Sequence, residues 1–338
     1  LWALHPTPAA IYAILFAWNL AAGAWLSRSI LRRGAAPVEP ERVLLAWSVL
    51  AFGGLLAVLC QMAQLLLFAG PFMLGVYDAY LARRKWAFAL WIAALCLVSE
   101  DAAMIAVCFG AYLFLFEDDG RAYGGTALAI SLPYVLFVLA VLQPAARVEL
   151  TLTGSTATAV VVKQLFSLSG GPLVVNLYSM LPLLAFIPAF ALAAGLFGLP
   201  DRRGLIRAAG LAAAPAFLHW GECVVVGGAH HLLPPWYGLF LGLLSWLRDA
   251  KGPARPPWAF AAAAAFLAAG LRVQAGHLPL SVKPALLRLA GRGAQAAALE
   301  RRLSGAEASN RAVIAAASSC TISFIHSSLV WCWMMNSI

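Results

Sequence analysis

Two long stretches without a formally charged side chain constrain this chain more than any other feature. Residues 1–27 contain no Asp, Glu, Lys or Arg, and neither do residues 43–77. A helix needs about 20 mostly apolar residues to cross about 30 Å of hydrocarbon. The first stretch is long enough for one membrane span and the second for two short spans. The chain is therefore predicted to be an integral membrane protein.

The composition agrees with this prediction and argues against a soluble or nucleic-acid-binding domain. The 338 residues are 63% hydrophobic and 11% charged, with a mean hydropathy of +0.85, whereas a soluble domain is about 25% charged. The net charge of +9 comes from short basic clusters between apolar runs, which is typical of the positive-inside pattern. We expect membrane lipids as partners, no nucleic acid, and a multi-pass location in a prokaryotic plasma membrane.

The apolar runs predict an all-α, polytopic helical bundle with about ten transmembrane helices. The expected spans are residues 9–26, 43–59, 63–81, 86–99, 102–116, 123–142, 172–198, 205–220, 234–248 and 257–271. Residues 1–271 are expected to form this transmembrane domain, and residues 272–338 a small extracytoplasmic tail. The final SSCTISFIHSSLVWCWMMNSI matches neither strand nor span patterning, and it is either a functional end or a frameshifted one.

Residues 86–116 can form either a hairpin of two helices, each roughly 21–23 Å long, or one helix of about 46 Å. The hairpin places the basic loops at 28–42, 82–85, 199–207 and 248–255 on one side of the membrane. A single helix would place the first two loops opposite the last two. The positive-inside rule favours the hairpin, with Glu100 and Asp101 at its extracytoplasmic tip.

The adjacent acids Glu100 and Asp101 are the first candidate for a chemical site. An ionisable residue within an apolar segment costs roughly 2.5–3.5 kcal/mol on insertion scales, and it usually faces a bundle interior or an aqueous cavity. The pair could hold a metal, a sugar or a lipid phosphate at the outer face. Alternatively, both acids are solvated at a turn, with Asp101 capping the second helix.

The second candidate lies in HWGECVVVGGAHHLLPPWY, between two predicted spans on the same outer side. Its members are His219, Glu222, His230 and His231. Clustered His and carboxylate side chains can bind a divalent cation, or supply a base and a phosphate partner. Their spacing matches no compact metal motif, and histidines beside interfacial aromatic residues are also common at membrane surfaces. Both interpretations stay open, as does the need for a divalent metal ion.

Four segments carry a resemblance to a known family. They are LWALHPTPAAIYAILFAWNLAAGAWLSRSILRR, LARRKWAFALWIAALCLVSEDAAMIAVCFGAYLFLF, GGAHHLLPPWYGLFLGLLSWLR and EASNRAV. Each resembles a part of the predicted membrane proteins called domain of unknown function 2079. That family is similar in layout to the C-type (GT-C) glycosyltransferase superfamily, whose members take sugars from polyprenyl-phosphate donors at the outer membrane face. The likeness runs over most of residues 1–315.

The resemblance implies sugar transfer, with an outer-loop acid acting as a base or metal partner. Glu100 or Asp101 would line the donor site and His231 would contact the phosphate. Ser99 stands where the family tends to have Lys, and the family's first span and outer loop would precede Leu1. We therefore expect a chain truncated at its N-terminus. A transporter or flippase of polar or lipid-linked cargo, and a non-catalytic membrane scaffold, are the alternatives.

Overall fold

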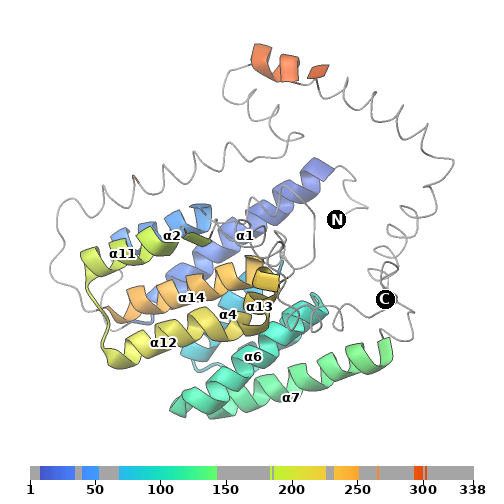
Figure 1. The fold of residues 1–338 in the computed structure, drawn as a ribbon, viewed down its shortest axis with the longest axis vertical. Helices are drawn as coiled ribbons and strands as arrows, with labels where there is room; N and C mark the ends of the chain where they lie inside the picture. The colour runs from blue at the N-terminus through green and yellow to red at the C-terminus, as the bar shows by residue number, and fades with distance from the viewer. Residues whose placement is uncertain are drawn as a thin grey trace. The chain divides into compact units, whose positions relative to one another are not determined.

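The computed structural model describes residues 8–34, 40–52, 68–142, 183–184, 186–225, 232–250, 265, 293–299 and 301–302. These residues form helices joined by short turns, with no strand among them (Figure 1). The all-α prediction is therefore confirmed for the described part of the chain. Contacts divide the protein into two compact units, Leu1–Leu278 and Pro279–Ile338. All the elements discussed below belong to the first unit.

The helices follow the apolar runs closely. They are α1 (Pro8–Leu31), α2 (Pro40–Phe52), α4 (Ala69–Leu81), α5 (Lys85–Cys96), α6 (Glu100–Phe116), α7 (Arg121–Phe137), α11 (Phe186–Phe197), α12 (Arg202–Ala213), α13 (Phe217–Val225) and α14 (Leu233–Asp249). Each expected span from 9–26 to 234–248 overlaps one of them. The expected span 257–271 lies outside the described residues, except for residue 265.

One helical stretch among the described residues is both long and apolar enough to cross a membrane. It runs from Asp118 to Val141, with 24 residues and a mean hydropathy of 2.0, and joins the 3-10 turn η2 (Asp118–Gly120), α7 and the π-helical turn η3 (Val138–Leu142). The apolar helices α5 and α11 are shorter, with 12 residues each, which is about 18 Å of rise. The number of spans therefore stays a prediction.

Residues 85–116 form the hairpin and not the single long helix. α5 ends at Cys96, and α6 begins at Glu100 after a turn in which the Leu97 and Val98 amides donate to Ala93 and Leu95 carbonyls. Ser99 is extended and its hydroxyl accepts from the Ala102 amide at 3.1 Å, so it is the N-cap of α6. The expectation that Asp101 caps this helix is wrong, because the cap must precede the first helical turn.

The expected span 205–220 is interrupted in its middle. α12 ends at Ala213, the 3-10 turn η5 (Ala214–Ala216) follows, and α13 begins at Phe217. Pro215 lies inside this turn. Proline has no amide hydrogen to donate and its ring crowds the preceding turn. Pro215 therefore marks a helix break in the sequence, but the run around it is apolar enough to be predicted as one continuous span.

Small residues bring α12 and α14 unusually close together. A Cβ added at Gly242 would lie 2.6 Å from the Ala208 carbonyl oxygen, and one at Gly238 would lie 2.6 Å from the Ala212 carbonyl oxygen. The two glycines are four residues apart and face alanines with the same spacing. Such small-residue seams allow helix backbones to approach closely in membrane bundles. Figure 1 shows the two helices running side by side.

Large aromatic side chains of α14 fill the centre of the bundle. Trp236, Tyr237 and Phe240 are fully buried, and the Tyr237 hydroxyl donates to Asn19 Oδ1 of α1 at 2.6 Å. This bond satisfies two buried polar groups that would otherwise cost free energy. It also fixes α14 against α1.

Candidate functional site

Ion pairs and hydrogen bonds join the ends of several helices at one end of the bundle, which we call the basic end. It is defined by residues 28–34, 40–42, 78–85, 117–121, 201–207 and 248–250. Arg33 of α1 pairs with Asp78 of α4 at 2.8 Å. Arg42 of α2 donates to the Leu247 and Ala250 carbonyls at the end of α14, where orphan carbonyls attract cations. These contacts bring the ends of α1, α4 and α14 together with the start of α2.

The centre of the basic end is a half-buried pair between Glu117 and Arg207. Arg207 Nε and Nη2 donate to the two carboxylate oxygens of Glu117 at 2.9 and 3.2 Å. The Tyr112 hydroxyl donates to the same carboxylate at 3.0 Å. Arg207 also approaches Asp249 at 3.4 Å. A bidentate pair of this kind is strong and directional, and it joins α6, α12 and α14.

Buried Arg248 extends the network to α4. Its guanidinium donates to Asp249 at 2.7 and 2.8 Å and to the Tyr77 hydroxyl at 3.1 Å. A buried cation is tolerated when it is paired and hydrogen-bonded. Arg83 adds a more exposed link, because it pairs with Asp119 at 2.7 Å.

These contacts place the described residues 28–34, 40–42, 82–85, 117–121, 201–207 and 248–250 at one end of the bundle. This is the grouping that the positive-inside argument predicted for the basic loops up to Asp249. Arg83 contacts Asp119 only because α5 and α6 return to the same end. That this end faces the cytoplasm stays a prediction.

Contacts along α6 show where its other end lies. From the end of α6 back toward Glu100, its residues meet later and later residues of α12–α13. The successive pairs are Glu117 with Arg207, Tyr112 with Gly210, Phe109 with Pro215 at the cavity, and Cys108 with Leu218. The α12–α13 segment therefore runs antiparallel to α6. The last turn of α13 and the first turn of α6 lie at the same end, which we call the Glu100 end.

Glu100 and Asp101 are in the first turn of α6 and are half-buried. Glu100 is about 25 Å along the helix from Glu117, given 1.5 Å of rise per residue. Tyr134 of α7 lies close enough to Glu100 to interact with it electrostatically. Nothing in the sequence indicated that Tyr134, which lies within an apolar run, would approach Glu100.

The second candidate cluster is only partly described. His219 lies on α13 and is 2% exposed, so a ligand reaches it only if the packing changes. Glu222 is in the second turn of α13, and the position of its side chain lies outside the described residues. His230 and His231 also lie outside them. The helices that flank these histidines, α13 and α14, both have their near ends at the Glu100 end.

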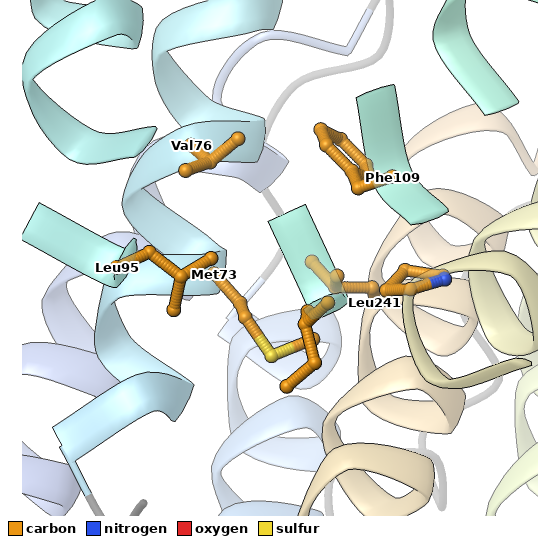
Figure 2. A pocket seen from close by; sticks show the side chains of 7 residues that line it. Met73, Val76, Leu95, Phe109 and Leu241 are labelled. Atoms are coloured by element: carbon orange, nitrogen blue, oxygen red, sulfur yellow. The ribbon is translucent and has the colours of Figure 1, made fainter. Parts of the chain in front are cut away.

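The cavity at the bundle centre is small and apolar. It has a volume of about 10 Å³ and is lined by Met73, Val76, Leu95, Ile105, Phe109, Pro215 and Leu241. Figure 2 shows these side chains converging from α4, α5, α6 and α14. Such a space holds at most about one water molecule. It is too small to bind a sugar.

No group of three or more His, Cys, Asp or Glu side chains that could hold a metal occurs among the residues that the structure describes. Glu100 and Asp101 supply two carboxylates, and therefore at most four of the six to eight oxygens that Ca²⁺ takes. The described residues therefore do not define a cation site.

The structural role of Glu117 has no signal in the sequence. Glu117 is half-buried and bidentately paired. Its partner Arg207 is 90 residues away in the sequence. The pair could have been predicted only if α6 and α12 had been expected to pack antiparallel.

The comparisons with known proteins identify a family and no activity. A family model described as "Predicted membrane protein (DUF2079)" matches residues 13–273. No curated protein matches the chain, and neither does any solved structure.

Proposed function

Because the chain belongs to the DUF2079 family of predicted membrane proteins, we propose that it is a multi-pass membrane protein with a glycosyltransferase-like site at its Glu100 end. The donor would be a sugar linked to a polyprenyl phosphate, taken at the extracytoplasmic face. The supporting observation is the antiparallel register of α6 with α12–α13. This register puts Glu100, Asp101 and the turn containing Glu222 at one end, opposite the arginine-rich basic end.

The chemistry requires a base and a partner for the leaving phosphate. A carboxylate of Glu100 or Asp101 would accept the proton of an acceptor hydroxyl as that oxygen bonds to the anomeric carbon. The bond from the anomeric carbon to the phosphate oxygen breaks, and its electron pair leaves with the polyprenyl phosphate. Positioned groups of this kind lower barriers by proton transfer and by charge stabilisation. His230 or His231 would stabilise the departing phosphate, with Glu222 and His219 in the surrounding shell.

Carboxylate-to-amide exchanges test this proposal. At least one of Glu100→Gln and Asp101→Asn should abolish most transfer of a radiolabelled sugar from polyprenyl phosphate to lipid or glycan products in membranes containing the intact protein. Asp118→Asn is the matched control, since Asp118 is an exposed acid at the basic end. Unchanged products in both Glu100 and Asp101 variants, at normal protein levels, would refute the assignment.

A transporter or flippase is the second candidate, favoured by the break at Pro215. Discontinuous helices at mid-depth form the substrate sites of many transporters. Pro215 lies halfway between Arg202 and Val225 and lines the central cavity. Uptake of lipid-linked sugar into proteoliposomes without any new product would favour this candidate over transfer.

A further inference from the structure

Three exposed basic side chains gather where α5 and α7 begin. Arg84 and Lys85 start α5, and Arg121 starts α7. The two helix starts are neighbours, because the Tyr123 ring lies 5.1 Å from the Phe88 ring in an edge-to-face contact. We call Arg84, Lys85 and Arg121 the α5–α7 basic cluster.

The acids nearest this cluster are largely engaged elsewhere. Asp119 pairs with Arg83, and Glu117 pairs with Arg207. Asp118 is exposed in the same turn. Within the part of the chain that the structure describes, no ion pair joins an acid to Arg84, Lys85 or Arg121. The cluster therefore keeps positive charge that is free to meet an anion.

An exposed apolar face continues directly from the cluster along α5. Trp86 and Leu90 are 86% and 71% exposed. Their positions, four residues apart, lie on one side of the helix. The order along α5 from its start is basic side chains, then an indole, then an aliphatic side chain, which matches headgroup, interface and hydrocarbon in a bilayer.

We propose that the α5–α7 basic cluster binds the headgroup phosphate of an anionic phospholipid, whose acyl chains lie along the exposed face of α5 that begins with Trp86 and Leu90. Arginine and lysine together offer several donors to a phosphate, and the neighbouring apolar face distinguishes a lipid from a free phosphate. This surface is at the basic end, so it does not depend on the proposed transfer site.

Arg202 and Arg203 at the start of α12 provide an internal control. They are also exposed and adjacent, and the exposed Ile206 follows them. Unlike α5, helix α12 carries no tryptophan after its two basic residues. If lipid binding depended only on net charge, neutralising Arg202 and Arg203 would weaken it as much as neutralising Arg84 and Lys85.

The test is a titration of the full chain in detergent micelles with phosphatidylglycerol, read by native mass spectrometry. The double variant Arg84→Gln/Lys85→Gln should bind about 25-fold more weakly than wild type, because each basic residue near an anionic surface contributes roughly 5-fold. Arg121→Gln should bind about 5-fold more weakly. Arg202→Gln/Arg203→Gln should keep the wild-type affinity.

Two further probes identify what the cluster recognises. Phosphatidylcholine and inorganic phosphate should not compete with phosphatidylglycerol at equal concentration. Equal weakening in both double variants would overturn the proposal and leave net charge as the cause. Unchanged binding in Arg84→Gln/Lys85→Gln, or full competition by inorganic phosphate, would also overturn it.

Discussion

The two ends of the bundle hold their charges in different ways. At the basic end, Glu117, Asp249 and Asp78 are each bound by an arginine from another helix. At the Glu100 end, Glu100 and Asp101 occupy the first turn of their own helix, shortly after the exposed turn residue Leu97. One end uses charge to hold helices together, and the other carries two adjacent half-buried carboxylates at a helix start.

This contrast shows how acids near apolar segments should be read. An acid that forms an ion pair with an arginine from another helix contributes to stability, because removing the acid leaves the arginine charge without a partner. An acid in a first helical turn is stabilised locally by the helix dipole, and its removal leaves no buried arginine unpaired. The variants below should therefore separate stability effects at one end from functional effects at the other.

Breaking the central ion pair should give the largest loss of stability. Glu117→Gln leaves half-buried Arg207 without its bidentate partner, and we expect a loss of about 2–4 kcal/mol in the free energy of unfolding, below the value for a fully buried pair because Arg207 is partly solvated. Thermal unfolding in detergent measures this loss. The double variant Glu117→Gln/Arg207→Gln should recover part of it. Additive losses would show that the pair has no coupling energy.

The close seam between α12 and α14 should be the next most sensitive. Gly242→Ala puts a Cβ within 2.6 Å of the Ala208 carbonyl oxygen, so the helices must separate, at a cost of about 1–3 kcal/mol. Gly125→Ala is the matched control, since nothing lies within 4 Å of its added Cβ. The control should be neutral or stabilised by roughly 0.5–1 kcal/mol. Equal melting temperatures for the two variants would show that the seam is looser than described.

At the Glu100 end, the cap is expected to matter more for stability than the acids. Ser99→Ala removes the acceptor of the Ala102 amide and should cost about 1 kcal/mol. Ser99→Asp, which can cap equally well, should restore stability. Glu100→Gln and Asp101→Asn should change the melting temperature less than Ser99→Ala does. A larger loss in either acid variant would move that acid from the functional to the structural group.

The smallest effect is expected at the turn between α4 and α5. Arg83 has a φ of 57°, a conformation that costs a non-glycine residue roughly 1–2 kcal/mol. Arg83→Gly should relieve this cost and lose an exposed ion pair worth at most about 1 kcal/mol. Arg83→Ala should lose the pair and keep the backbone cost, so it should unfold at a lower temperature than Arg83→Gly. The reverse order would contradict this account of the turn.

Sequence patterning predicted the helices better than the breaks between them. The charge-free runs and basic clusters placed α1, α2, α4–α7 and α14 because the membrane-crossing pattern depends on local composition. The same reasoning predicted the α5–α6 hairpin from charge alone. The break at Pro215 was missed, since one proline changes hydropathy little but removes a backbone donor.

The candidate site was predictable in its location and not in its contacts. Glu100 and Asp101 could be assigned to a hairpin tip from sequence, and they lie at that turn. The pairing of Glu117 with Arg207 could not be predicted, because it depends on helices that meet 90 residues apart. The approach of Tyr134 to Glu100 depends on the same tertiary packing.

Cysteine accessibility is the most direct test of the central claim, that the basic end and the Glu100 end face opposite sides of a membrane. Single cysteines replace Arg84, Leu97 or Asp118, all exposed, in a chain whose six native cysteines are removed. A membrane-impermeant maleimide is then applied to intact and to permeabilised cells. Our account predicts that position 97 reacts in intact cells, whereas positions 84 and 118 react only after permeabilisation. Reaction of position 97 from the same side as positions 84 and 118 would contradict it.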